Sequence, residues 1–215
     1  MKNNIKTVYM AILAIMVWCG LVIQFYISTE KYMSQGRTFG GAIVQLISYF
    51  TIENNILVAL ALTALLLWPS SKLGSFFSRP SVLGAITVYI TIVCLVYQLV
   101  LRGQHTQYGW FRFCDEILHS ISPPMFVLYW LLFIPKAKLA WGKAINWLLF
   151  PLLYCFYILI RGAISNYYPY SFIDGTKLTY LQIFINCVFL LLAFLSVGLA
   201  VIAINRFGKK DAVTT

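Results

Sequence analysis

The sequence predicts an all-α polytopic membrane protein, a bundle of six transmembrane helices with both termini in the cytoplasm. Hydrophobic residues make up 61% of the chain and charged residues only 10%, whereas a soluble domain carries about 25% charged residues. Six apolar segments are each long enough to cross a bilayer as a helix, which takes roughly 20 residues. These runs do not alternate between apolar and polar residues, so we expect helices and not the strands of a membrane barrel.

Short connections between the spans indicate a single integral membrane domain over residues 1–215. The first apolar run is too long for a signal-peptide core and no small-x-small cleavage site follows it, so we expect it to be retained. Gly36 and Gly41 mark the turn before the second span, Pro69 ends that span, Pro80 opens the third and Pro135 ends the fourth. The fifth and sixth spans are expected from the length of their apolar runs. The six ranges are about 7–28, 41–68, 81–101, 114–134, 145–165 and 178–205.

The excess of positive charge sets the expected orientation. The chain has 16 Lys and Arg against 6 Asp and Glu, a formal net charge of +10. Basic residues in short loops mark the cytoplasmic side, and more of them lie on the side of the termini: Lys2, Lys6, Lys72, Arg79, Lys136, Lys138, Lys143, Arg206, Lys209 and Lys210. We therefore expect a multi-pass protein of the cell membrane, either the bacterial inner membrane or the plasma membrane. No basic cluster stands apart from the spans, so nucleic acid is not an expected partner.

The second predicted span carries polar residues that lipid cannot satisfy. Thr51, Glu53, Asn54 and Asn55 interrupt an otherwise apolar helix. Asn54 and Asn55 follow Thr51 by three and four positions and share its face, whereas Glu53 points about 200° away from Thr51. Because hydrocarbon offers no hydrogen-bond partners, we expect this cluster to face the interior of the bundle.

The fourth predicted span carries a histidine with two acids one turn before it. Asp115 and Glu116 precede His119 by four and three positions, so either carboxylate can accept the imidazole N–H and fix its tautomer. Pro123 and Pro124 lack backbone N–H groups, so we expect a kink that leaves carbonyls near His119 unpaired. A hydroxyl and an imidazole are the minimum set for a nucleophile and its base.

Thr51 and His119 form such a pair only if they lie at the same depth. Thr51 lies about ten residues, roughly 15 Å, inside the second span, and His119 lies about five residues, roughly 8 Å, inside the fourth. The two depths agree if the fourth helix begins earlier, near Gly109, or tilts.

Structural and metal-binding interpretations compete with catalysis. A threonine in a membrane helix commonly bonds its own i−4 carbonyl, asparagine commonly links helices, and a single histidine can be a packed or helix-end residue. A zinc site built from His105, His119 and one acid is an alternative. Glu116 and His119 form one Glu-x-x-His, and the chain has no second one. It also has no Walker loop, no G-x-S-x-G or H-E-x-x-H motif, and its five cysteines form no C-x-x-C. We therefore expect no metal and no cofactor.

The chain resembles the androgen-induced-gene/ADTRP-like family of six-span proteins, including its bacterial relatives. Besides the six spans with both ends cytoplasmic, the residues that carry the resemblance are Phe50, Thr51, Asn54, Asn55, Leu118, His119, Pro123 and Pro124. In the animal members, a threonine and a histidine are regarded as the catalytic pair that hydrolyses fatty acid esters of hydroxy fatty acids. The resemblance implies Thr51 as the nucleophile and His119 as the general base.

Several residues are expected to assist this pair. Asp115 and Glu116 are candidates to support His119. Glu53, in the second span, is a further candidate supporting residue. The side chains of Asn54 and Asn55 are candidates to donate to the oxyanion of a tetrahedral intermediate. The substrates of the family keep a free carboxylate, for which Arg161, four residues after Tyr157 near the outer end of the fifth span, is the candidate partner.

The expected function is an intramembrane lipid ester hydrolase of the threonine type, with membrane lipids or lipid esters as its partners. Two alternatives stay open. One is a non-catalytic membrane protein that binds or transports a lipid or a small molecule through the polar cluster. The other is a zinc-dependent membrane hydrolase.

Overall fold

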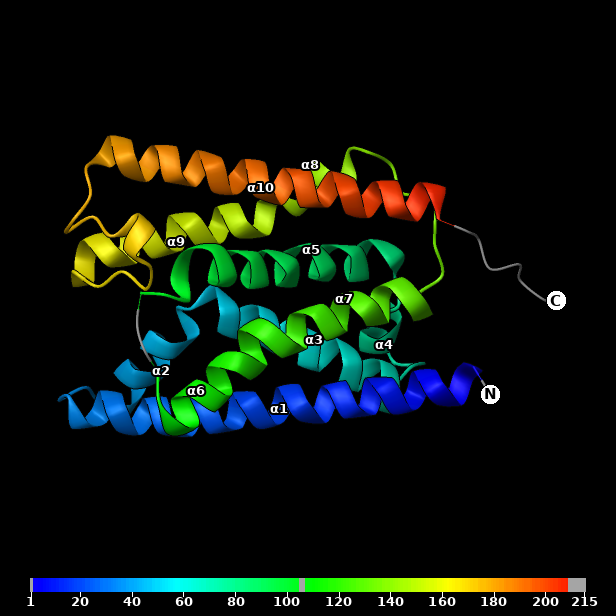
Figure 1. Ribbon diagram of the computed structural model, residues 1–215, viewed down its shortest axis with the longest axis horizontal. Helices are drawn as coiled ribbons and strands as arrows, with labels where there is room; N and C mark the ends of the chain where they lie inside the picture. Colours follow the sequence, from blue (N-terminus) through cyan, green and yellow to red (C-terminus); the bar gives the residue numbers. More distant parts are fainter. Residues whose placement is uncertain (1, 105–106, 209–215) are drawn as a thin grey trace. The chain divides into compact units, whose positions relative to one another are not determined.

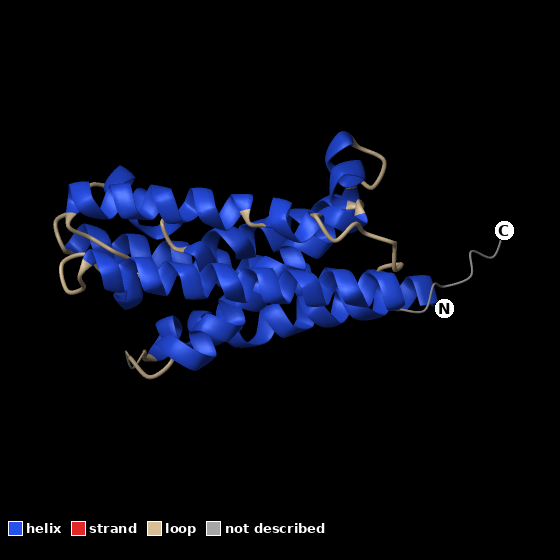
Figure 2. Ribbon diagram, turned by 90° about the horizontal axis from the view of Figure 1, so that it is seen from above, coloured by secondary structure: helices blue, strands red, loops and turns tan. Residues whose placement is uncertain are grey.

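The computed structural model describes residues 2–104 and 107–208, and every regular element in these ranges is a helix (Figure 1, Figure 2). Six helices are long and apolar enough to cross a membrane, which confirms the predicted all-α class and the number of spans. The observed spans are Asn4–Ser34, Phe50–Leu67, Pro80–Leu101, Gly109–Phe133, Lys143–Ser165 and Tyr180–Phe207. The cytoplasmic location of both termini stays a prediction.

The chain divides into two compact units. The first unit holds the described residues up to Ala137 and the second holds Lys138–Gly208. Four of the spans belong to the first unit and two to the second. The single membrane domain expected over residues 1–215 stays a prediction.

The first unit is built around the long helix α1. In Figure 1, α1 (blue) runs beside α6 and α7 (green), and it also packs against α3, while α5 packs against α3 and α7. Apolar side chains such as Leu13, Leu62, Ile90 and Phe126 are fully buried between these helices. The elements are α1 (Lys2–Ser34), α2 (Phe39–Ile47), α3 (Phe50–Leu67), α4 (Lys72–Phe77), α5 (Pro80–Val96), η1 (Tyr97–Leu101), α6 (Gly109–Glu116), η2 (Ile117–Ile121) and α7 (Ser122–Phe133).

Several helices begin where the sequence supplies a cap. The side chains of Thr38 and Ser71 accept hydrogen bonds from the backbone N–H groups three residues on, at the starts of α2 and α4. Pro80 occupies the first turn of α5, where its missing N–H costs nothing. These positions agree with the turn signals of the sequence.

The second span is broken, although the sequence predicts one helix over 41–68. Helix α2 ends at Ile47, Tyr49 has an extended backbone (φ −88°, ψ 123°), and α3 begins at Phe50. The Ser48 hydroxyl donates to the Val44 carbonyl at 2.6 Å, a local bond of the kind that competes with helix continuation. Thr51 is therefore the second residue of α3 and not a residue deep within a long helix.

Two other spans contain a π-turn, in which a backbone N–H bonds the carbonyl five residues earlier. In η1 the N–H of Arg102 bonds the carbonyl of Tyr97 at 2.8 Å, and in η2 the N–H of Ser122 bonds the carbonyl of Ile117. The second π-turn stands where Pro123 and Pro124 predicted a kink. A π-turn inserts one residue into an α-helix and is found frequently at functional sites.

The second unit contains α8 (Lys143–Trp147), α9 (Leu149–Ser165), the 3-10 turn η3 (Ser171–Ile173) and α10 (Tyr180–Phe207), with α10 packed against α8, α9 and η3. Helix α9 ends at Ser165 and is followed by Asn166, which has a left-handed backbone (φ 53°). In the loop before α10, a hydrogen bond from the Thr176 hydroxyl is the main factor that lowers the pKa of Asp174 below its ordinary value, and Lys177 adds an ion pair.

Candidate active site

The side chains of Thr51 and His119 meet although they are far apart in the sequence. Thr51 Oγ1 lies 3.0 Å from His119 Nε2, across the first turn of α3 and the π-turn η2. Thr51 is 7% exposed and the His119 side chain is 17% exposed. The two side chains are therefore mostly buried but remain partly accessible from the protein surface. The depth condition is met because α3 begins at Phe50 and the fourth span begins at Gly109.

The break in the second span explains why the Thr51 hydroxyl is available to the histidine. Thr87 and Thr91 in α5 donate their hydroxyls to the carbonyls four residues earlier, at 2.8 and 2.6 Å, as threonines in membrane helices commonly do. For Thr51 the residue four positions earlier is Ile47, which belongs to α2. Thr51 consequently has no such carbonyl in its own helix, and its hydroxyl turns to His119.

Asp115 fixes the tautomer of His119. The imidazole Nδ1 lies 3.0 Å from Asp115 Oδ1 and 3.0 Å from the Asp115 backbone carbonyl. Both neighbours are hydrogen-bond acceptors, so Nδ1 carries the proton of the neutral ring. The lone pair of Nε2 then faces Thr51 Oγ1, and the threonine hydroxyl is the donor of that hydrogen bond.

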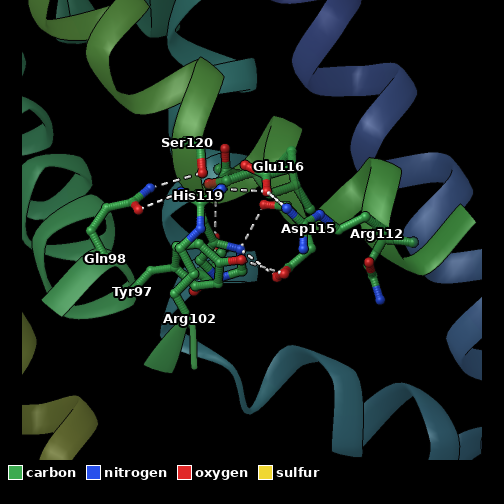
Figure 3. A network of polar contacts seen from close by, with 12 residues as sticks. Tyr97, Gln98, Arg102, Arg112, Asp115, Glu116, His119 and Ser120 are labelled. Carbon is green, nitrogen blue, oxygen red and sulfur yellow. Dashed lines mark hydrogen bonds and ion pairs between the residues drawn. The ribbon is translucent and has the colours of Figure 1, made fainter. Parts of the chain in front are cut away.

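Tyr97 contacts both Asp115 and His119 (Figure 3). Its hydroxyl donates to Asp115 Oδ2 at 2.5 Å, and its ring stacks on the imidazole with centroids 4.3 Å apart and planes 20° from parallel. The sequence interpretation did not select this residue. Its aromatic ring near the end of a span resembles the many interface aromatics of a membrane protein, and no spacing signal links it to His119.

Glu116 takes a different partner from Asp115. Its Oε1 accepts from Arg102 at 2.7 Å and from Arg112 at 2.6 Å. Gln98 extends the group, because its Oε1 accepts from Arg102 at 2.6 Å and its Nε2 donates to the Ser120 hydroxyl at 2.9 Å (Figure 3). The arginine side chains are 42% and 49% exposed, so this polar network is more exposed than the Thr51–His119 pair.

Asn55 ties the two helices of the pair together. Its Nδ2 donates to the carbonyls of Thr51 at 2.9 Å and Leu118 at 3.0 Å, and its Oδ1 accepts from the Ser122 hydroxyl at 2.7 Å. The Leu118 carbonyl needs this donor, because the π-turn diverts the N–H of Ser122 and the next residue, Pro123, has none. Both amide hydrogens of Asn55 are therefore taken, and neither is left for an oxyanion.

Asn54 and Glu53 lie beside the pair in sequence, but neither is bonded to it. Asn54 Nδ2 donates to the Phe50 carbonyl at 2.7 Å, within its own helix. Glu53 is half-buried in the first turn of α3. In the described part of the chain its carboxyl group makes no hydrogen bond or ion pair.

Arg161 and Tyr157 belong to α9 in the second unit. The Arg161 guanidinium lies over the Tyr167 ring at 5.5 Å from its centroid, and Tyr157 is 40% exposed. A role for these residues in holding a substrate carboxylate stays a prediction.

The zinc alternative needs His105, which lies outside the described residues. Within residues 2–104 and 107–208, no three His, Cys, Asp or Glu side chains gather into a group that could hold a metal ion. In the described part of the chain, His119 has a carboxylate next to one ring nitrogen and a hydroxyl next to the other.

No family model, curated protein or solved structure matches the chain. The resemblance to the androgen-induced-gene/ADTRP-like family stays a prediction.

Proposed function

We propose that the chain is an intramembrane lipid ester hydrolase of the cell membrane, with Thr51 as the nucleophile and His119 as the general base. The observation that carries the proposal is the contact of 3.0 Å between Thr51 Oγ1 and His119 Nε2, with Asp115 on the opposite ring nitrogen. A hydroxyl, an imidazole and a carboxylate in this order are the arrangement of hydrolases that act through an acyl-enzyme.

The reaction proceeds in two halves. Thr51 Oγ1 attacks the ester carbonyl carbon while its proton moves to His119 Nε2, and the collapse of the tetrahedral intermediate returns that proton to the leaving alcohol. Water then attacks the acyl-threonine ester and gives a proton to Nε2, after which Thr51 leaves with that proton and the fatty acid departs. Asp115 stabilises the imidazolium that exists between these transfers.

The dipole of α3 stabilises the oxyanion in this proposal. At the start of α3 the N–H groups of Ile52 and Glu53 bond the Tyr49 carbonyl, and the helix dipole favours negative charge at this end. Thr51 is the second residue of α3, so the developing oxyanion forms next to this helix end. This assignment replaces the side chains of Asn54 and Asn55, whose amide groups serve backbone carbonyls.

The surroundings of the pair favour a substrate that is part lipid and part polar. The acyl chain enters from the hydrocarbon between helices, and water enters past the exposed arginines Arg102 and Arg112. If both termini are cytoplasmic, this opening faces the extracytoplasmic side. Carboxylic esters with a long acyl chain, including fatty acid esters of hydroxy fatty acids, are the proposed substrates.

The test is the hydrolysis of a panel of lipid esters by the purified protein in detergent. We expect Thr51→Ala and His119→Ala to lower kcat/KM by about three orders of magnitude or more, and Thr51→Ser to retain part of the activity because it keeps a hydroxyl. Thr87→Ala is the matched control, since it removes a buried threonine whose hydroxyl bonds only its own helix. Equal turnover by wild type and Thr51→Ala on every ester would contradict the proposal.

A further inference from the structure

Tyr97 joins the carboxylate and the imidazole of the site from a third helix. It is 5% exposed and opens the π-turn η1, whereas Thr51 lies on α3 and His119 on η2. Asp115 and His119 both lie on the span Gly109–Phe133, so contacts between them do not fix either one relative to the rest of the unit. Tyr97, a residue of another span, touches both.

We infer that Tyr97 is a positioning residue of this site: its hydroxyl sets the orientation of the Asp115 carboxylate, and its ring sets the plane of the His119 imidazole. The inference rests on the proposed function and deepens it. Tyr97 acts through Asp115 and His119, and its part in the reaction is to hold the base in the geometry that the proton transfer requires.

The hydroxyl of Tyr97 anchors the oxygen of Asp115 that does not face the histidine. Oδ1 lies 3.0 Å from His119 Nδ1, and Oδ2 accepts from the Tyr97 hydroxyl at 2.5 Å. A carboxylate held through one oxygen can turn about its terminal bond, whereas a carboxylate held through both keeps one plane. Partners of this kind orient a histidine and preserve its tautomer.

The ring of Tyr97 restricts the other rotation, that of the imidazole. The ring centroids lie 4.3 Å apart with the planes at 20°, so the two rings are stacked. Rotation of the imidazole about its terminal bond would collide with the tyrosine ring. The stack therefore holds Nε2 toward Thr51 Oγ1 while Nδ1 stays toward Asp115.

The π-turn places Tyr97 and Arg102 on the same face of their helix. In an uninterrupted α-helix, residues five positions apart point about 140° away from each other. Arg102 directly follows η1, and its guanidinium lies over the Tyr97 ring at 5.8 Å from its centroid. Tyr97 contacts Asp115 and Arg102 contacts Glu116. The two π-turns η1 and η2 pack against each other. The inserted residue thus allows one face of this helix to contact both Asp115 and Glu116.

The first experiment compares Tyr97→Phe, which keeps the stack and removes the hydroxyl, with Tyr97→Leu, which removes both. Tyr89→Phe is the matched control, since Tyr89 is a buried tyrosine two turns earlier on the same span. We expect Tyr97→Phe to lower kcat about tenfold and Tyr97→Leu about a hundredfold, with KM unchanged. A rise in KM without a fall in kcat, or an effect no larger than that of Tyr89→Phe, would overturn the inference.

The second experiment reads the histidine directly and needs no substrate. The chain has two histidines, so His105→Gln leaves His119 as the single histidine for ¹⁵N NMR of the imidazole. In this background we expect a neutral ring with Nδ1 protonated and Nε2 unprotonated. Adding Tyr97→Phe should shift both nitrogens toward the average of the two tautomers, and adding Tyr89→Phe should leave them in place.

The two experiments separate failure of the inference from failure of the proposed function. If Nδ1 is protonated and Tyr97→Phe shifts the tautomer, while no ester is hydrolysed, Tyr97 positions His119 and the proposed hydrolysis is wrong. If esters are hydrolysed through Thr51 and His119, while Tyr97→Phe changes neither kcat nor the imidazole spectrum, the hydrolase stands and the role of Tyr97 is refuted.

Discussion

The two units of the chain differ in how they use buried polar groups. Among the described residues, eight of the nine buried polar side chains lie in the first unit and one, Asn205, lies in the second. The eight are Ser28, Gln45, Ser48, Thr51, Asn54, Asn55, Thr87 and Ser122. The second unit has two spans, and many large apolar side chains are exposed on their surfaces.

The bonds that these groups make differ as well. In the first unit several cross from one helix to another: Thr51 to His119, Asn55 to the Leu118 carbonyl and Ser122 to Asn55. In the second unit Asn205 donates to the Val201 carbonyl of its own helix. A buried polar group costs free energy unless it is paired, so a network across helices both removes that cost and fixes the helices relative to one another. The comparison shows that the polar network across helices, and with it the proposed site, belongs to the first four spans.

The largest expected effect comes from exchanging one acid in each unit. Asp115→Asn offers an amide in place of the carboxylate, so Nδ1 of His119 can lose its proton to the other tautomer, and we expect kcat/KM to fall by about two to four orders of magnitude. Asp174→Asn, in the loop of the second unit, should change it less than twofold. Ester hydrolysis at saturating and limiting substrate measures both. Comparable losses in the two variants would break the comparison.

Asparagine variants test the difference in stability. Asn55→Leu leaves the Leu118 carbonyl and the Ser122 hydroxyl without their partner, and we expect it to lower the free energy of unfolding by about 2–3 kcal/mol. Asn54→Leu and Asn205→Leu remove bonds within a single helix and should cost less than about 1 kcal/mol. Unfolding in detergent by titration with sodium dodecyl sulfate gives the three values. A cost for Asn205→Leu equal to that of Asn55→Leu would contradict the account.

Two glycines give a smaller contrast. A Cβ on Gly20 of α1 would lie 2.8 Å from Ile117 Cγ2 and 3.2 Å from Leu118 Cδ2, and both atoms belong to the π-turn that carries His119. A Cβ on Gly198 would lie 3.5 Å from the nearest atom, Ala144 Cβ. We expect Gly20→Ala to lower stability by about 1–3 kcal/mol, as overpacking does, and to lower activity by displacing His119. Gly198→Ala should be tolerated. Thermal unfolding and hydrolysis rates of the two variants decide the matter, and a Gly20→Ala protein that matches wild type would show that the close approach of α1 is not needed.

The smallest expected effect on activity comes from linking two helices of the second unit. Cys155 and Cys187 have sulfur atoms 3.5 Å apart across α9 and α10. Oxidation by copper phenanthroline should join them in a disulfide with loss of two hydrogens. The disulfide is seen as two cysteines protected from alkylation. We expect hydrolysis to change less than about twofold, because the proposed reacting groups lie in the first unit. Cys187→Ser is the control without the bond. Strong inhibition that depends on Cys187 would assign the second unit a part in the reaction.

The sequence predicted the six spans because length and hydropathy decide whether a helix can cross a bilayer. It also selected Thr51 and His119, because polar groups in such spans are costly and these two have complementary chemistry. It did not predict the break at Ser48 and Tyr49, where neither Pro nor Gly interrupts the helix. The Ser48 hydroxyl bonds the Val44 carbonyl at this break, and the break leaves the Thr51 hydroxyl without an i−4 carbonyl in its own helix.

Other features of the site depend on geometry that spacing alone does not contain. Asp115 and Glu116 both lie one turn before His119, and the π-turn together with Arg102 and Arg112 decides which acid faces the imidazole. Tyr97 comes from another span, and only the packing of the spans shows its contact with both Asp115 and His119. The sequence predicted that the Asn55 amide donates hydrogen bonds, but to an oxyanion. In the structure it donates to backbone carbonyls, among them the Leu118 carbonyl that Pro123 leaves unpaired.

The most direct measurement of the central claim is the position of a covalent adduct formed with an activated acyl ester or phosphonate probe. Mass spectrometry of the labelled protein should place the adduct on Thr51. Labelling should be lost in His119→Ala, strongly reduced in Asp115→Asn, and retained in the control Thr87→Ala. An adduct on another residue, or labelling of Thr51 that is undiminished in His119→Ala, would contradict the account.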